Sequence, residues 1–131
     1  MPSSEKKTAR VLKTSLFSKW ARKARIKDDE LCIAIKEVLL GQAVDLGGGV
    51  FKKRLNENMH RSIILARGGK VWVYEYLFAK KDRDNIGNDE LVGFRKLAKA
   101  YEALTHRQIE RLVEDGDFLE ICHGENEQVQ N

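Results

Sequence analysis

Glycines divide the middle of the chain into short alternating segments, and this pattern restricts the fold more than any other feature. Three glycines at 47–49 precede the first segment, at 50–56, and Gly68–Gly69 separates the second, at 60–66, from the third, at 71–80. Paired glycines between alternating apolar runs are typical of tight β-hairpins. The pattern therefore predicts three consecutive antiparallel strands.

Helical patterns lie on both sides of these strands. After a short first strand at 10–15, the apolar residues Leu16, Phe17, Trp20, Ala21 and Ala24 recur at helical spacing, opposite Lys19, Arg22 and Lys23. Thr14 or Ser15 can cap this helix, and Asp28 with Asp29 can open a second one that ends at Gly41. So short a link predicts an antiparallel helical hairpin.

Two more helices are expected after the strands. Asn88 is a candidate cap for a helix with a long apolar stripe, and the sequence Thr-His-Arg-Gln at 105–108 matches a capping box that opens a short last helix. The order β-α-α-β-β-β-α-α predicts an α+β fold. We expect an antiparallel sheet of about four strands, with an N-terminal helical hairpin and C-terminal helices.

The bulk composition fits one cytoplasmic domain. A chain of 131 residues is long enough for a single core, and we expect one domain over 1–131. No apolar run approaches the roughly 20 residues of a membrane span, and the first residues lack the apolar stretch of a signal peptide. The two cysteines, Cys32 and Cys122, form no spaced pair, so we expect reduced thiols.

The positive charge is concentrated on the predicted strands. Residues 47–83 carry 9 cations and 3 anions, whereas residues 84–131 carry 5 cations and 11 anions. Such an excess points to a polyanionic partner. Charge alone favours a simpler interpretation, in which the cations form a solvated face of the sheet.

The strand period places several of these cations together. Lys52 and Arg54 share one face of their strand, and Phe51 and Leu55 share the other, which we expect to face the core. Arg61 opens the neighbouring strand within reach of the same outward surface. Lys80, Lys81 and Arg83 lie at the end of the segment at 71–80, and Lys53 and Arg67 are further candidate contacts to the polyanionic partner.

A cluster of this kind suits a phosphodiester substrate. Arginine offers a planar fork for phosphate, and lysine offers a compact charge whose pKa cationic neighbours can lower. Cleavage of RNA through its 2′-OH needs a base, cations that stabilise the charged transition state, and an acid, but no metal. Passive binding of nucleic acid remains the alternative that spacing alone favours.

Other candidate sites are weaker. His60 is a candidate general acid or base, although a single histidine at a strand start is more often a surface residue. Cys122 and His123 lack a second ligand pair, and we expect neither a metal nor a cofactor. The row Trp72, Tyr74, Tyr76 and Phe78 is expected to be core under the helices, not a platform for bases.

Several of these segments together resemble a known family. The segments "GGGVFKKRL", "HRSIIL" and "LFAKKDRDNI" resemble the RelE branch of the RelE/ParE toxin superfamily, near its HigB-like members. The resemblance covers about residues 10–104. The helix at about 105–116 then lies outside the family core, and the tail at 124–131 is expected to fray.

The resemblance implies a toxin of a type II toxin–antitoxin system that cleaves mRNA on the ribosome. It implies that Lys52, Arg54 and Arg61 are catalytic cations, with the later cation matched by Lys81 or Arg83. It also implies a cognate antitoxin, expected to be a helix-turn-helix protein, through which alone the toxin would contact operator DNA.

One position departs from the family pattern, and two other functions stay open. RelE-like chains often carry an aromatic residue, which stacks on the substrate base, shortly after the last cation, whereas this chain has Ile86 and Gly87. A ParE-like toxin that poisons DNA gyrase would have the same fold, although such chains generally lack the clustered cations. A non-enzymatic nucleic-acid-binding module is the third interpretation.

Overall fold

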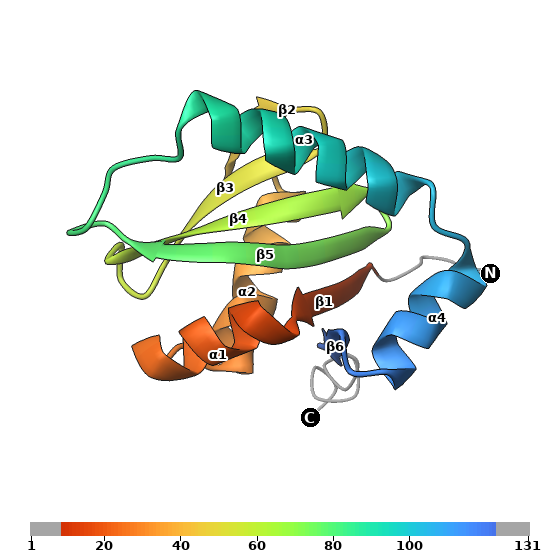
Figure 1. Ribbon diagram of the computed structural model, residues 1–131. Helices are drawn as coiled ribbons and strands as arrows, with labels where there is room; N and C mark the ends of the chain where they lie inside the picture. The colour runs from red at the N-terminus through yellow and green to blue at the C-terminus, as the bar shows by residue number, and fades with distance from the viewer. Residues whose placement is uncertain (1–8, 123–131) are drawn as a thin grey trace.

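The chain forms a six-stranded sheet with helices on both of its faces (Figure 1). This computed structural model describes residues 9–122. The elements in chain order are β1 (Arg10–Thr14), α1 (Ser15–Ala24), α2 (Asp28–Leu39), β2 (Val44–Gly47), β3 (Val50–Leu55), β4 (His60–Arg67), β5 (Val71–Ala79), α3 (Asn88–Glu102), α4 (His106–Glu114) and β6 (Phe118–Ile121). The predicted α+β class is confirmed.

The sheet is larger than predicted and is mixed. Its strand order is β2-β3-β4-β5-β1-β6, and β1 pairs parallel with β5 while the other neighbours pair antiparallel. The expectation of about four antiparallel strands missed β2 and β6, each only four residues long. The three strands β3, β4 and β5 are adjacent, as the glycine pattern predicts. Gly68 and Gly69 both have positive φ angles in the turn that joins β4 to β5.

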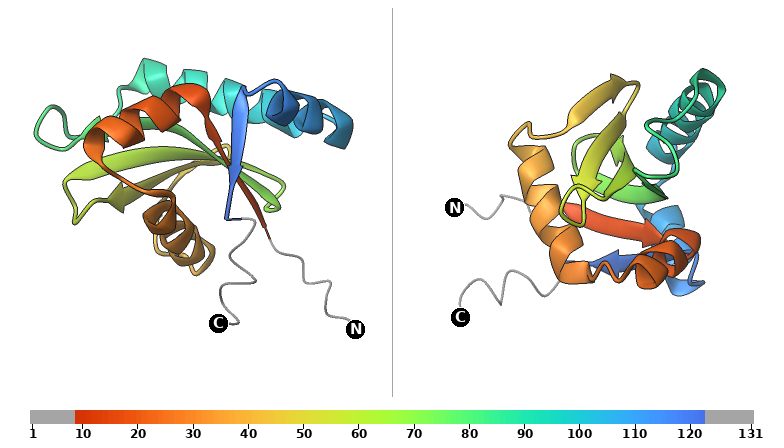
Figure 2. Two further views of the ribbon diagram at one scale, coloured as in Figure 1. Left: turned by 90° about the horizontal axis from the view of Figure 1, so that it is seen from below. Right: turned by 90° about the vertical axis from the view of Figure 1, so that its left-hand side faces the viewer.

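The first two helices begin where the sequence predicts. The Thr14 hydroxyl accepts a hydrogen bond of 3.0 Å from the Phe17 amide, and Asp28 and Asp29 lie in the first turn of α2. The two helices do not run antiparallel, because their axes cross (Figures 1 and 2). Arg25 turns the chain between them with a left-handed φ of 62°. α1 therefore lies along β5, and α2 lies across one face of the sheet.

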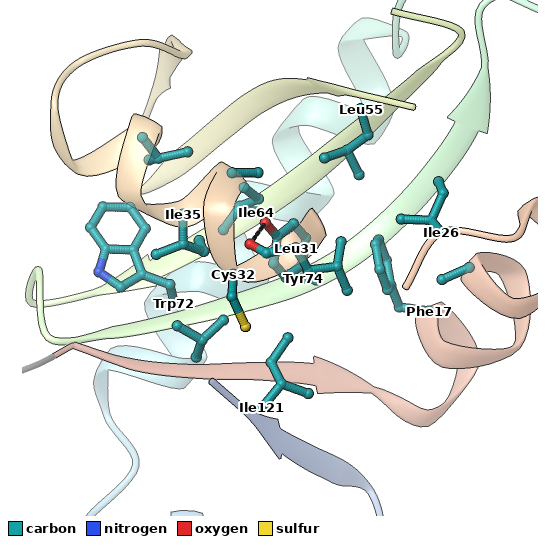
Figure 3. Packing of buried hydrophobic residues seen from close by; sticks show 14 of the residues in the cluster. Phe17, Ile26, Leu31, Cys32, Ile35, Leu55, Ile64, Trp72, Tyr74 and Ile121 are labelled. Carbon is teal, nitrogen blue, oxygen red and sulfur yellow. Dashed lines mark hydrogen bonds between the residues drawn. The ribbon is translucent and has the colours of Figure 1, made fainter. Parts of the chain in front are cut away.

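The two faces of the sheet have separate cores. On the face under α2, Phe17, Leu31, Ile64 and Tyr74 belong to one buried cluster, in which the Tyr74 hydroxyl donates to the Leu31 carbonyl at 2.7 Å (Figure 3). On the other face, Val50, Ile63, Leu65 and Phe78 pack under α3. A third cluster joins β1, β6 and α4.

A bulge at Glu75 divides the aromatic row of β5 between these two faces. Ile64 pairs with Tyr74, and the adjacent Ile63 pairs with Tyr76, so Glu75 is an extra residue in the ladder. Trp72 and Tyr74 consequently pack in the α2-side cluster, whereas Tyr76 and Phe78 pack in the α3-side cluster. Trp72, Tyr74 and Phe78 are buried core, as predicted, whereas Tyr76 is partly exposed, and the four residues do not share one face.

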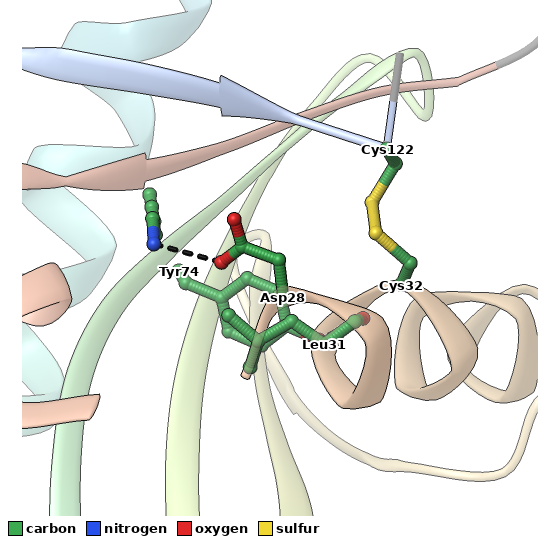
Figure 4. Close-up of a disulfide and its surroundings, with 6 residues drawn as sticks. Asp28, Leu31, Cys32, Tyr74 and Cys122 are labelled. Carbon is green, nitrogen blue, oxygen red and sulfur yellow. Dashed lines mark hydrogen bonds and ion pairs between the residues drawn. A yellow bond between two sulfur atoms is a disulfide. The ribbon is translucent and has the colours of Figure 1, made fainter. Parts of the chain in front are cut away.

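The cysteines are disulfide-bonded, so the prediction of reduced thiols is wrong. Cys32 on α2 and Cys122 after β6 are joined with their Cα atoms 5.6 Å apart (Figure 4). The two residues are 90 positions apart in the chain, and they meet because β6 pairs with β1 beside α2. No local spacing could have shown this pairing.

The C-terminal helices also follow their local signals. Thr105 and Gln108 form the predicted capping box, with hydrogen bonds of 3.1 Å and 2.8 Å. The cap of α3 is Gly87 in place of Asn88, and the Gly87 amide donates to Glu90 at 2.6 Å. The tail at 124–131, predicted to fray, lies outside the described residues. Among the described residues, no helix has the length and apolar character that crossing a bilayer requires.

Candidate nucleic-acid site

Three of the predicted cations lie on the α3 side of the sheet. Arg54 pairs directly with Arg61 across β3 and β4, and Arg61 pairs with Phe78 on β5. In the next row Lys52 pairs with Ile63, and Ile63 pairs with Tyr76. Residues in register share a face, and Ile63 and Phe78 belong to the α3-side core. The end of β5 extends past the start of α3, so α3 itself does not lie over this corner of the sheet (Figure 1).

Arg61 is more buried than the sequence predicts. Only 9% of its surface is exposed, and its Nη1 donates to the carbonyls of Asn58 at 3.0 Å and His60 at 3.2 Å. The turn before it holds three consecutive residues, 56–58, with left-handed φ angles of 57°, 53° and 73°. Arg61 therefore braces a strained turn as well as adding charge to the face.

Arg83 joins this group from the segment after β5. Its guanidinium lies over the Phe78 ring, with its Cζ 5.4 Å from the ring centroid, and donates to the Tyr76 hydroxyl at 3.3 Å. It also forms an ion pair with Glu90 on α3. The hydrogen bond from Arg83, followed by that from the Gly87 amide, lowers the pKa of Glu90. We name Lys52, Arg54, Arg61 and Arg83 the cationic face.

His60, Lys80 and Lys81 lie around the end of β5, where two adjoining pockets open. One pocket of about 660 Å³ is lined by all three residues, and the other, of about 680 Å³, is lined by His60, Lys81 and Arg83. His60 Nδ1 lies 3.1 Å from the Asn56 side-chain amide nitrogen. We name these two pockets the end groove. Arg83 connects the groove to the cationic face.

Sequence reasoning missed the part of the end groove that α1 contributes. Trp20, Lys23 and Ala24 line it. The helical pattern assigned Trp20 to the apolar stripe of α1, and Trp20 does pack beside the α2-side core. The available signal was a tryptophan followed by a lysine three positions later in a helical pattern.

Two predicted cations lie apart from this cluster. Lys53 is on the α2 side of the sheet, where its Nζ is 2.7 Å from a Glu37 carboxylate oxygen and 3.0 Å from the Gln42 carbonyl. Arg67, at the far end of β4, donates to the carbonyls of Tyr101 and Leu104 at the end of α3. Both side chains hold secondary-structure elements together. Ile86, which stands near the position of the missing aromatic residue, packs beside the α3-side core.

A mixed sheet that carries a cluster of arginine and lysine on one face, beside an open groove, defines a domain suited to binding phosphodiesters. A family model described as the RelE toxin of the RelE/RelB toxin–antitoxin system matches residues 9–121. The chain therefore belongs to the RelE toxin family. No curated protein and no solved structure gives a significant match.

The family match covers more of the chain than the motifs predicted, but it does not single out a branch of the family. It runs through α4 and β6, beyond the range of 10–104 expected from the motifs. It concerns the RelE family as a whole, so the placement near the HigB-like members stays a prediction.

Proposed function

We propose that this protein is an mRNA endonuclease that cleaves translated message on the ribosome and so inhibits translation. Membership of the RelE family implies a toxin with endoribonuclease activity. The observation that supports cleavage most directly is the Arg54–Arg61 pair, with Lys52 one row away and Arg83 over Phe78. Four cations around one surface match the charge that develops on a phosphodiester during cleavage.

The proposed reaction is attack of the ribose 2′-oxygen on the adjacent phosphorus. The bond from phosphorus to the 5′-oxygen breaks, which leaves a 2′,3′-cyclic phosphate and a free 5′-hydroxyl. In this proposal the exposed Arg54 contacts the phosphate, and the largely buried Arg61 and the neighbouring Lys52 add positive charge beside it. His60, Lys80, Lys81 and Arg83 are the candidates for removing the 2′ proton and protonating the leaving oxygen. No step requires a metal.

The cellular setting follows from the same proposal. A nuclease of this kind acts in the cytoplasm, where ribosomes and message are found, and a RelB-type antitoxin is the partner that family membership implies. A helix-turn-helix architecture for that antitoxin stays a prediction, as does contact with operator DNA through the antitoxin alone.

Arg54→Ala tests the proposed activity. Arg54 is exposed, and truncating an exposed residue should change stability by no more than about 0.5 kcal/mol. Cleavage of message, mapped by primer extension after expression in growing cells, should fall by about 10²-fold, because a preorganised cation is lost. Lys96→Ala, which removes an exposed cation from α3, is the matched control and should cleave like the wild type.

The alternatives give different results. Growth arrest with uncut message, together with inhibition of purified DNA gyrase, would identify a ParE-like toxin. RNA binding without cleavage or growth arrest would identify a non-enzymatic binding module. Wild-type cleavage by Arg54→Ala would remove Arg54 from the proposed site.

A further inference from the structure

The end groove is lined by aromatic rings and cations, and it lies beside the part of β5 that has no neighbouring strand on its β1 side. β1 pairs with β5 only from Val71 to Tyr74, so beyond the bulge at Glu75 the outer side of β5 has no strand beside it. α1 packs against β5. Trp20 reaches Tyr76 there with its ring edge-on, the centroids 5.3 Å apart and the planes at 83°.

Neither of these rings is fully buried. Trp20 and Tyr76 are both partly exposed, and both line the pocket of about 680 Å³. By contrast Trp72, the other tryptophan of the chain, is only 6% exposed and packs in the α2-side core. The volume lies within the range of pockets that hold small organic ligands.

Three cations border the same pocket from different elements. Lys23 lies one helical turn after Trp20, and Lys81 and Arg83 follow β5. Lys23 and Lys81 are exposed and form no ion pair with any residue between 9 and 122. Asp82 and His60 complete the polar part of the lining. Aromatic faces bind flat π systems, and neighbouring cations bind phosphate.

We propose that this groove holds one base of a single-stranded RNA, with Trp20 as the stacking residue and with Lys23 and Lys81 on the flanking phosphates. The assignment rests on the proposed function, because it takes the substrate to be RNA. Arg83 lies on both the groove and the cationic face, so a base in the groove would be adjacent to the phosphate that the cationic face holds. Trp20 would then fix the position of the nucleotide that lies beside the cleaved bond.

A binding assay that needs no cleavage tests this assignment. The probe is a fluorescein-labelled trinucleotide with 2′-O-methyl groups, which cannot be cut, and its anisotropy is measured with the full-length protein. Trp20→Leu should weaken binding by at least about tenfold, because stacking on the base is lost. Trp20→Phe keeps an aromatic ring and should stay within about threefold of the wild type. Leu16→Ala changes a residue on the same helix that is 51% exposed and outside the groove, and it should bind like the wild type.

A fluorescence measurement covers the case in which Trp20→Leu fails to fold. In Trp72→Phe the only tryptophan is Trp20, and the trinucleotide should quench its emission. Unchanged affinity in a folded Trp20→Leu protein, or no quenching in Trp72→Phe, overturns the proposal. Adenosine monophosphate that binds as tightly as the trinucleotide also overturns it and identifies a site for free nucleotides.

The outcomes for the groove and for the proposed activity are separable. Trp20-dependent binding of the trinucleotide by a protein that leaves message uncut would retain the base site and reject the nuclease. Cleavage that depends on Arg54 but not on Trp20 would retain the nuclease and reject the base site.

Discussion

Glu75 is a partly buried carboxylate whose ionisation opposes folding. Burial raises its pKa, although the hydrogen bond of 2.7 Å from the Tyr101 hydroxyl opposes this rise. The folded protein therefore binds the proton more tightly than the unfolded chain does, and the free energy of unfolding falls as pH rises through the pKa of Glu75.

Glu75→Gln keeps an oxygen that can accept a hydrogen bond from Tyr101 and removes the charge. We expect Glu75→Gln to melt above the wild type at pH 7.5 and to approach it near pH 4 in thermal unfolding. Glu114→Gln, which changes an exposed residue of α4, should show no such pH-dependent gain. A gain that is equal at both pH values would assign the effect to something other than ionisation.

The turn between β2 and β3 sets how closely α3 approaches the sheet. Gly49 has a φ of 85°, and an added Cβ would lie 3.2 Å from the Ala66 carbonyl oxygen and 3.4 Å from the Ala98 Cβ on α3. Gly41, after α2, has a φ of 88° with nothing within 4 Å of such a Cβ. Both alanine substitutions incur the left-handed backbone penalty of roughly 1–2 kcal/mol. Only Gly49→Ala adds crowding, so urea unfolding should show a larger loss of stability for Gly49→Ala than for Gly41→Ala. Equal losses would mean that α3 moves away from the turn without cost.

The elements that could be predicted are those with local signals. The strands β3 to β5 follow from glycines that lie beside them in sequence. The caps follow from hydroxyl residues directly before helical patterns, at Thr14 and Thr105, and Gln108 completes the second as a capping box. The opposite faces of Lys52 and Lys53 follow from strand alternation, but the partner of Lys53 on α2 does not. Pairing of β6 with β1, burial of Arg61 and the contribution of Trp20 to the groove all depend on distant segments, which no local pattern encodes.

At the scale of the whole molecule, the Cys32–Cys122 disulfide joins two segments that are far apart in the sequence. It links the strand at one edge of the sheet to α2 and closes a loop of 90 residues. By the chain-entropy account, a loop of this length stabilises the folded state by about 4–5 kcal/mol. Reduction with dithiothreitol should therefore lower the Tm by on the order of 10–20 °C. The double variant Cys32→Ser and Cys122→Ser should melt near the reduced wild type and should not respond to dithiothreitol. A Tm that is insensitive to dithiothreitol in the wild type would show that the bond does not limit unfolding.

The bulge in β5 bears on how the length of this chain can change during evolution. Tyr74 and Tyr76 lie on opposite faces although they are two positions apart, because Glu75 is the extra residue between them. Removal of residue 75 alone would leave a regular strand with every other side chain on its present face. Removal of Tyr76 would restore the same alternation, because Glu75 and Tyr76 both face the α3 side, but it would delete a ring that packs beside the α3-side core. Among relatives of this toxin, a one-residue gap in the strand should therefore fall at position 75.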